Sequence, residues 1–346
     1  MKIGIITGKD DEISLNKDIN KLVPKKYYEN GNVHTDIALA FLMKERFVGF
    51  QVDIITPKEL TNQRLKKNDI NFIIGYDIIN QLNDDPHVKK FAGQKGLEKL
   101  DKMYKLKTNK VFPSYPFLSL LWSKKEYLQL LEKNKIPISP TVFVKKNIPI
   151  KTLLNKVKGK KWSNFIIKPI GGTIANGLGI FNTKECIQDP SILQVYFDEE
   201  NQYYDEYLVQ EKIDGFTKYG EVKTFWIDGK LSYAVNTPGA TSPDDEYVVK
   251  EVIDKSVLNQ CEKIGKKIFE VLPKITFNQK KTLPVLIRID FACCKKNKQH
   301  KSVNYFVNEI ESDIAGTYIN FPNVKYPMLE VMADTYIKKA KEVGLK

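Results

Sequence analysis

Two stretches, L-I-R-I-D-F at residues 286–291 and F-V-N-E-I-E at residues 306–311, decide how this chain folds. Apolar and polar side chains alternate in both, which is typical of β-strands with one buried face. The alternation places Asp290 on the polar face of the first strand, and Glu309 and Glu311 together on that of the second. If the two strands pair as a hairpin across the lysine-rich segment between them, Asp290 lies opposite Glu309. Three carboxylates are therefore expected on one patch of sheet.

These carboxylates are candidate ligands of a divalent cation. Like charges this close repel each other unless a cation or a proton lies between them. Mg²⁺ prefers a few carboxylate oxygens together with phosphate oxygens, so the pattern fits this ion. Arg288 shares the polar face with Asp290 and adds a fixed cation beside the site. The alternative that stays open is an edge hairpin whose charged face is exposed to solvent.

A second candidate site is the glycine-rich stretch I-G-G-T-I-A-N-G-L-G at residues 170–179. Its backbone N–H groups are able to cradle phosphate oxygens, because glycine lets the backbone approach closely. The spacing matches neither the P-loop nor the dinucleotide fingerprint. Lys168 ends the apolar strand just before this loop, and a lysine at the end of a buried strand needs an anionic partner such as a nucleotide phosphate. A mobile hairpin turn and a lysine that extends to solvent are the alternatives.

A third candidate is Y-L-V-Q-E-K-I at residues 207–213, an apolar strand that becomes polar at its end. Backbone groups at such an end are able to meet the edge of an adenine ring. Composition alone does not distinguish this segment from any other strand end.

The rest of the pattern predicts an α/β protein in three parts. Strands at 2–7, 51–56 and 70–75 alternate with a helix at 34–48, which favours a mostly parallel sheet. We expect an N-terminal α/β domain at residues 1–110, a small subdomain with the glycine-rich loop at 111–215, and a C-terminal subdomain with the metal site at 216–346. Further helices are predicted at 119–134, 254–271 and about 326–342. Further strands are predicted at 141–144, 164–169, 179–182, 207–213, 221–227, 230–236, 285–293 and 304–310.

The charge of the chain is strongly basic. Its net charge is +13, from 55 Lys and Arg residues against 42 Asp and Glu residues. Most of the basic residues are lysines scattered in short runs, which is typical of solvated faces. Nucleic acid is therefore not an expected partner, whereas an acidic substrate is compatible with this charge.

Several other classes of protein are not expected. The four cysteines form no C-x-x-C pair and the three histidines lie far apart, which disfavours a disulfide framework or a zinc site. No Ser–His or Cys–His arrangement indicates a protein nucleophile. No apolar run is long enough for a signal peptide or a membrane span, so we expect a cytoplasmic protein without membrane association.

The order of these motifs resembles the ATP-grasp superfamily, in particular glutathione synthetase, D-alanine–D-alanine ligase and the glutamate-adding ligases. The resemblance covers about residues 110 to 320, and the N-terminal unit is similar to the domain that precedes the ATP-grasp fold. It implies an ATP-grasp fold whose two subdomains clasp the nucleotide. The motifs in chain order are Lys124, Lys168-Pro169, the glycine-rich loop, Gln210-Glu211-Lys212-Ile213, Glu221, Arg288-x-Asp290 and Asn308-Glu309-x-Glu311.

The resemblance implies a role for each matching residue. The implied contacts to the ATP phosphates are Lys124 (or its neighbour Lys125), Lys168, Gly171 and Gly172. The implied contacts to the rest of the nucleotide are Gln210, Glu211, Lys212 and Ile213 at the adenine and Glu221 at the ribose. The implied ligands of Mg²⁺, or of Mn²⁺ in its place, are Asp290, Glu309 and Glu311. Arg288 and Lys168 are the implied catalytic residues, and Lys223 is the implied substrate contact. The last metal position is often Asn in these families, so Glu311 adds a negative charge.

The function implied by the resemblance is that of an ATP-dependent carboxylate–amine or carboxylate–thiol ligase. Such an enzyme transfers the γ-phosphoryl group to a carboxylate, and an amine or thiol then displaces phosphate from the acyl phosphate. The expected substrates are small-molecule or peptide carboxylates and amines, and a homo-oligomer is compatible with this function. An ATP-grasp small-molecule kinase, such as an inositol phosphate kinase, is one alternative. A nucleotide-binding regulatory module is the other.

Overall fold

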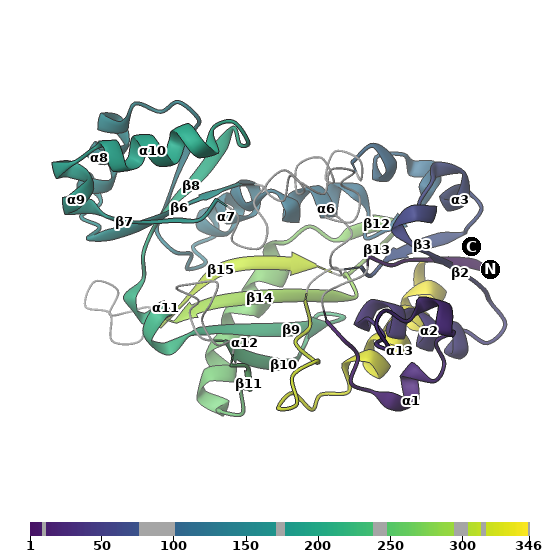
Figure 1. Cartoon of the computed structure of the whole chain (residues 1–346). Helices are drawn as coiled ribbons and strands as arrows, with labels where there is room; N and C mark the ends of the chain where they lie inside the picture. Colours follow the sequence, from purple (N-terminus) through teal and green to yellow (C-terminus); the bar gives the residue numbers. More distant parts are fainter. Residues whose placement is uncertain are drawn as a thin grey trace.

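The computed structural model describes residues 1–8, 12–75, 101–170, 177–237, 248–293, 304–312 and 316–344. Its first sheet is parallel, with the strand order β2-β1-β3-β4 (Figure 1). The strands are β1 (Lys2–Ile6), β2 (Gln51–Ile55), β3 (Ile70–Ile73) and β4 (Val111–Phe112). Helix α2 (Thr35–Arg46) connects β1 to β2, as a parallel pair requires. The predicted mostly parallel N-terminal sheet is confirmed.

Short helical segments complete this part of the chain. They are α1 (Lys17–Asn20), α3 (Asn62–Lys66) and the 3-10 helices η1 (Lys25–Tyr27), η2 (Pro57–Glu59) and η3 (Lys107–Asn109).

The second sheet is antiparallel and has the order β5-β8-β6-β7. Its strands are β5 (Thr141–Lys145), β6 (Asn164–Pro169), β7 (Gly179–Asn182) and β8 (Glu206–Glu211). Helices α8 (Ile150–Gly159), α9 (Thr183–Gln188) and α10 (Ser191–Glu200) lie together on one side of this sheet (Figure 1). A separate apolar core that includes Leu153, Phe165 and Tyr207 holds helices and sheet together.

The third sheet is antiparallel and has the order β11-β10-β9-β14-β15. Its strands are β9 (Glu221–Ile227), β10 (Lys230–Thr237), β11 (Lys250–Glu251), β14 (Leu286–Cys293) and β15 (Tyr305–Ser312). Helix α12 (Lys255–Val271) packs on one face. A Cβ atom on Gly265 of this helix would lie 2.1 Å from the indole of Trp226, so only glycine permits this close packing. The opposite face carries the polar residues of the predicted site.

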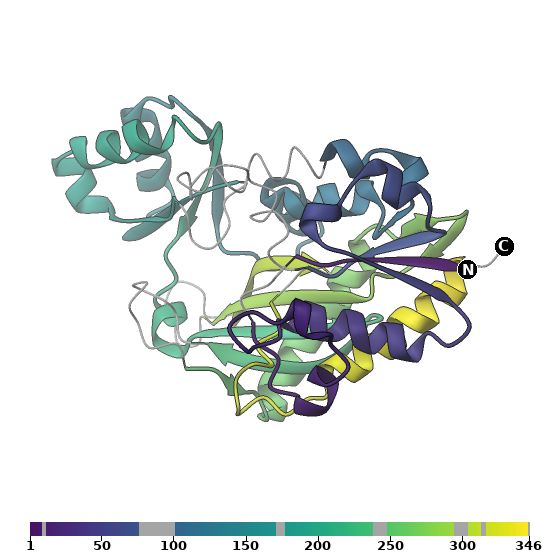
Figure 2. The same cartoon turned by 45° about the vertical axis from the view of Figure 1, so that its right-hand side comes forward.

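The chain returns to its first sheet at its end. Helix α13 (Met328–Gly344) packs against α2, and Figure 2 shows the yellow C-terminal helix beside the purple-blue N-terminal one. Arg46 of α2 donates to the Asp334 carboxylate at 2.6 Å, which links the two helices. The hairpin β12 (Ile275–Phe277) and β13 (Lys280–Thr282) and the helix α11 (Asp214–Tyr219) were not predicted.

The predicted helix at 119–134 is wrong in its boundaries. Two helices, α6 (Tyr115–Trp122) and α7 (Lys124–Lys133), meet at Ser123, which has extended backbone angles of φ −91° and ψ 92°. The Ser123 hydroxyl accepts a hydrogen bond from the Glu126 N–H at 3.3 Å, as serine at a helix N-cap commonly does. The break makes Lys124 the first residue of a new helix. Of the helices in the described part of the chain, none is both long enough and apolar enough to cross a membrane.

Candidate active site

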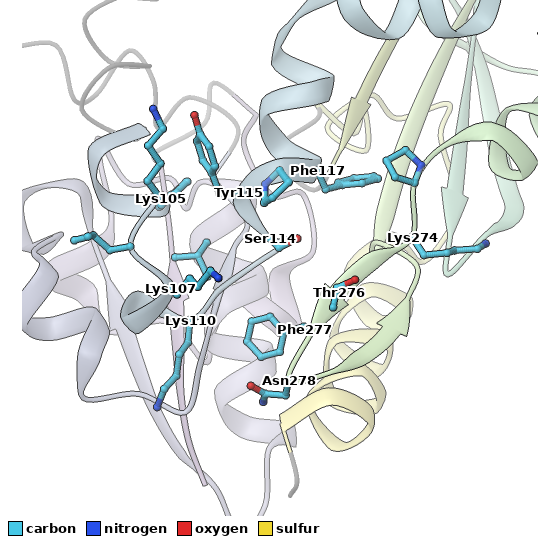
Figure 3. A pocket seen from close by; sticks show the side chains of 15 residues that line it. Lys105, Lys107, Lys110, Ser114, Tyr115, Phe117, Lys274, Thr276, Phe277 and Asn278 are labelled. Carbon is cyan, nitrogen blue, oxygen red and sulfur yellow. The ribbon is translucent and has the colours of Figure 1, made fainter.

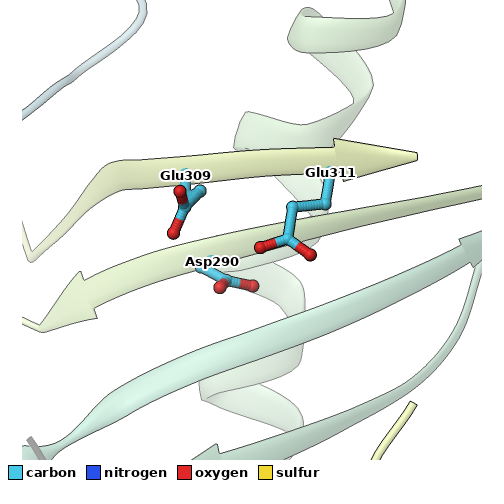
Figure 4. A group of neighbouring side chains, drawn as sticks. All are labelled: Asp290, Glu309 and Glu311. Carbon is cyan, nitrogen blue, oxygen red and sulfur yellow. The ribbon is translucent and has the colours of Figure 1, made fainter. Parts of the chain in front are cut away.

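Three carboxylates meet on the polar face of the third sheet, as Figure 4 shows. Asp290 on β14 pairs with Glu309 on β15, and Arg288 pairs with Glu311, so the predicted strand register is confirmed. One oxygen from each of Asp290, Glu309 and Glu311 lies within 4.8 Å of the other two. Hard oxygen ligands at this spacing are able to hold Mg²⁺.

A β-bulge brings an additional polar residue to this face. The pairing shifts after Asp290, because Phe291 pairs with Val307 and leaves Asn308 as an extra residue on β15. The Asn308 side-chain amide donates to the Glu221 carboxylate at 2.7 Å. Strict alternation would have directed Asn308 to the opposite face, so this contact was not predictable from the pattern.

Arg288 is the central cation of the site. Its guanidinium donates to both oxygens of Asp290 at 2.8 and 2.9 Å, and to Glu311 at 2.6 Å. A fourth hydrogen bond, to the Gly316 carbonyl, measures 3.2 Å. The side chain is 5% exposed, so its pairing with carboxylates offsets the cost of burying its charge.

The two glutamates of the site differ in their electrostatic surroundings. Burial raises the pKa of Glu311, and the nearby charges of Glu309 and Asp290 add to this rise although Arg288 opposes it. The pKa of Glu309 falls although burial opposes the fall, because the ammonium groups of Lys124 and Lys168 stabilise its charged form. Metal binding would therefore compete with a proton at Glu311 more than at Glu309.

Lys223 belongs to the same buried network. It lies opposite Asp290 on β9 and donates to Asp290 at 2.8 Å and to the Glu221 carboxylate. The ring of Tyr318 covers both Lys223 and Arg288, with its centroid 5.8 Å from each charged group. The substrate contact proposed for Lys223 stays a prediction, and it would add to the ionic contacts that this lysine already makes.

The structure distinguishes the two adjacent candidate lysines of α7. The Lys124 ammonium lies 2.6 Å from a Glu309 oxygen, whereas Lys125 pairs with Glu206 of the small subdomain at 2.8 Å. Lys124 is therefore the one that faces the carboxylate cluster. Consecutive helix residues point about 100° apart, so the two do not face the same partner.

Lys168 comes from the opposite subdomain, at the end of β6. It is partly buried, and within the described ranges of the chain it forms no ion pair. The pKa of Lys168 is lowered to about 8, first by burial and then by the charge of Lys124, although Glu309, Glu221 and Asp290 act in the other direction. A half-desolvated cation without an ionic partner is suited to bind an added anion.

The segment predicted to meet adenine, residues 207–213, already forms hydrogen bonds and apolar contacts within the protein. The N–H of Glu211 donates to the Pro140 carbonyl and that of Lys212 to the Asn164 carbonyl, both at 3.0 Å. The buried Gln210 amide donates to Thr141 at 2.8 Å, and Ile213 packs in a small apolar cluster. Adenine recognition here stays a prediction that depends on the other backbone groups of the segment.

The other predicted nucleotide contacts, at Gly171, Gly172 and Glu221, stay predictions. Gly171 and Gly172 lie outside the described residues. Gly177, at the end of the same loop, has φ +72°, a left-handed conformation that favours glycine. Glu221 is buried and accepts from Lys223 and Asn308 through different oxygens, so a ribose contact would have to replace or share one of these partners. That contact stays a prediction.

Sequence reasoning missed a link between the first sheet and the site. Glu12, just after β1, accepts hydrogen bonds from the N–H groups of Thr317 at 3.0 Å and Tyr318 at 2.6 Å. In the same short segment, the Gly316 carbonyl accepts a hydrogen bond from the Arg288 guanidinium. Glu12 and Arg288 thus hold this segment from two sides. No local pattern marks Glu12, because its partners are about 300 residues away in sequence.

A cavity of about 630 Å³ lies elsewhere, between residues 104–117 and the β12–β13 hairpin (Figure 3). Lys105, Lys107, Lys110 and Lys274 lie around it, but Lys110 donates to the Asn68 carbonyl and Lys105 is 3.5 Å from Asp101. None of the carboxylates of the third sheet lines it. The chemistry of the carboxylate cluster, rather than the volume of this cavity, therefore marks the candidate site.

The whole chain is similar to solved structures of ligases. D-cycloserine synthetase DcsG matches with a TM-score of 0.64 and 11% identity, over 98% of this chain and 99% of that one. D-alanyl-alanine synthetase A from Vibrio cholerae matches with a TM-score of 0.59 and 13% identity, over 99% and 98%. The ATP-grasp ligase PsnB, complexed with a minimal precursor, matches with a TM-score of 0.57 and 12% identity, over 98% of each chain.

No protein-family model and no curated protein sequence matches this chain. Identities of 11 to 13% show a common fold, and the chemistry has to be argued from the site. The similarity nevertheless extends over nearly the full length of this chain and of each solved structure. The chain therefore has the fold of the ATP-grasp ligases.

Proposed function

We propose that this protein is an ATP-dependent ligase that activates a carboxylate as an acyl phosphate and joins it to an amine or thiol, with release of ADP. One observation carries the proposal. Three carboxylates and Arg288 converge on one sheet face. The charge of Lys168 interacts with those of Glu309 and Asp290, and Lys168 has no ion pair within the described ranges. That arrangement suits a triphosphate and its metal ion bound between the subdomains at 111–215 and 216–346.

The donor set fits Mg²⁺, and also Mn²⁺. Asp290, Glu309 and Glu311 supply three carboxylate oxygens within 4.8 Å of one another, and phosphate oxygens would complete the coordination. When bound, such an ion neutralises charge on the phosphates and orients them. Side chains of the protein itself would bind the phosphates and stabilise the charge of the transferred phosphoryl group.

Each cation has a distinct task in this proposal. Lys168 and Lys124 hold the phosphates of ATP, with backbone N–H groups of Gly171 and Gly172. Arg288, fixed by Asp290 and Glu311, stabilises charge on the phosphoryl group as it moves to the carboxylate. The γ-phosphorus–oxygen bond to ADP breaks as the bond to the acceptor carboxylate oxygen forms. The amine or thiol then attacks the acyl carbon and displaces phosphate.

The proposed substrates are small-molecule or peptide carboxylates and amines. The solved structures support this class, because their names are those of a D-alanine–D-alanine ligase, a D-cycloserine synthetase and a ligase that binds a precursor peptide. The basic charge of the chain is compatible with an acidic acceptor.

Trapping the acyl phosphate tests the proposal directly. With ATP, Mg²⁺ and a suitable acid, but without an amine, hydroxylamine should yield a hydroxamate together with ADP. The assay is a screen of candidate acids that records ADP release and hydroxamate colour. A stable phosphate ester without hydroxamate would instead indicate a kinase. If no acid or alcohol stimulates ADP release, the protein is a nucleotide-binding module and the ligase proposal is wrong.

ATP binding should weaken as the pH rises above 8. The pKa of Lys168 is about 8 in the free protein, and phosphate favours the charged lysine, so ATP raises this pKa. The contact is therefore complete below pH 8 and is lost above it, by up to about tenfold in affinity per pH unit. At pH 9, binding should take up a proton, which calorimetry in two buffers of different ionisation enthalpy measures.

Lys168→Arg is the control for this pH dependence. The guanidinium stays charged at pH 9, so proton uptake on ATP binding should disappear in this variant. Equal proton uptake by the variant and the unmodified protein would show that another group titrates.

A further inference from the structure

Protein cations already pair with each of the three candidate metal ligands. Asp290 accepts from Arg288 and Lys223, Glu311 accepts from Arg288, and the Lys124 ammonium lies 2.6 Å from Glu309. A metal ion at this site must therefore compete with ammonium or guanidinium groups for the same oxygens.

Lys124 differs from the other cations in its exposure to solvent and in the element that carries it. Arg288 and Lys223 lie within the sheet and their side chains are only 5% and 8% exposed. Lys124 comes from the first turn of α7, with its side chain 18% exposed, and its partner Glu309 is 23% exposed. An ion pair that is partly in water exchanges partners at lower cost than a buried pair does.

Lys168 supplies a reason for such an exchange. Lys124 lies on α7 and Lys168 at the end of β6, and the positive charge of each lysine favours the ionised form of Glu309. Two ammonium groups and a metal ion at one carboxylate would repel one another strongly. A polyphosphate that enters between the lysines removes this repulsion, because it supplies the negative charge that both lysines require.

We infer that Lys124 is an exchangeable stand-in for the metal ion: it neutralises Glu309 in the nucleotide-free protein, moves to the ATP phosphates when nucleotide binds, and so leaves Glu309 to the metal. The inference rests on the proposed function, since it requires a nucleotide at this site. Its consequence is that the metal binds weakly without nucleotide and tightly with it. Reciprocity requires that the metal increases nucleotide affinity by the same factor.

The test measures protein-bound Mn²⁺ by equilibrium dialysis with EPR detection, and the Mn²⁺ that the nucleotide chelates in the protein-free compartment is subtracted. The unmodified protein should bind Mn²⁺ about 10- to 100-fold more tightly when a non-hydrolysable imido analogue of ATP is present. Lys124→Met removes the competing ammonium. Without nucleotide it should bind Mn²⁺ about tenfold more tightly than the unmodified protein, and the enhancement by the analogue should shrink by a similar factor.

Lys125→Met is the matched control. Lys125 is the next residue on the same helix but pairs with Glu206, so its loss should leave Mn²⁺ affinity unchanged without nucleotide. Lys124→Gln serves as a second variant if the methionine side chain disturbs folding, which circular dichroism detects.

The outcomes separate this inference from the proposed function. If the unmodified protein binds neither Mn²⁺ nor the analogue when both are present, the proposed function is wrong. If it binds both, and the Lys124 variants bind Mn²⁺ no more tightly than the unmodified protein, the exchange is overturned and nucleotide binding stands. An equal gain in Mn²⁺ affinity in the Lys124 and Lys125 variants would also overturn the proposed exchange, because the gain would then come from the loss of any nearby positive charge.

Discussion

Glu309→Gln is expected to lower the rate of ATP-dependent ADP release by about 1000-fold, because one ligand charge of the metal is lost, which corresponds to several kcal/mol of transition-state stabilisation. Glutamine keeps the shape of the side chain. Since the Glu309 side chain is 23% exposed and lies at the sheet edge, the fold should stay intact. Initial rates at saturating ATP and substrate give the effect, and thermal unfolding by circular dichroism shows whether the protein is folded.

Glu206→Gln is the control for this variant. Glu206 is 33% exposed and pairs with Lys125, so it matches Glu309 in residue type and in its lysine partner but lies outside the carboxylate cluster. It should retain a near-normal rate. If Glu309→Gln also turns over normally at ordinary Mg²⁺ concentration, the three carboxylates do not form the metal site.

A substitution at Asp290 would test the metal site less selectively than one at Glu309. It is 1% exposed and receives hydrogen bonds from Arg288 and Lys223, so Asp290→Asn changes the stability of the network as well as any metal binding. For this reason Glu309 is the better position for testing the chemistry.

Arg288→Met is expected to reduce the free energy of unfolding by about 3–5 kcal/mol, measured by urea denaturation without metal or nucleotide. The substitution leaves the buried Asp290 carboxylate and the partly buried Glu311 carboxylate without their shared guanidinium, and the Gly316 carbonyl without this donor. Breaking one partner of a buried charge network costs more than the intact network contributes, because the remaining charges stay desolvated.

Arg46→Met provides the comparison. Arg46 and Asp334 form an ion pair between α2 and α13, with side chains 32% and 68% exposed, so its loss should cost only about 0–1 kcal/mol. A loss at Arg288 no larger than that at Arg46 would show that the Arg288 network does not stabilise the fold as described.

The alternation of side chains determined much of the site before any tertiary structure was known. Strands repeat every two residues, so the quoted stretches had to place Asp290, Glu309 and Glu311 on one face, and the hairpin register then put Asp290 opposite Glu309. The bounds of β6, β7 and β9 also follow from local pattern, because turn residues and glycines mark their ends. Short-range sterics and burial decide these features.

Other features depended on contacts between distant parts of the chain. Local sequence did not show that Lys124 rather than Lys125 faces Glu309, since that depends on the helix break at Ser123 and on how α7 packs against the sheet. The contact of Asn308 with Glu221 needs a bulge that the alternating pattern does not reveal.

The chain's own sequence thus determined the sheet that carries the carboxylates, whereas tertiary structure decided which cations surround them. Glu12 shows the difference most clearly. It accepts hydrogen bonds from the N–H groups of Thr317 and Tyr318, which lie 305 and 306 positions further along the sequence. The physical reason is the separation along the chain over which each effect acts. Side-chain periodicity is a property of a few neighbouring residues, but an ion pair or a hydrogen bond between elements exists only after packing has brought both partners together.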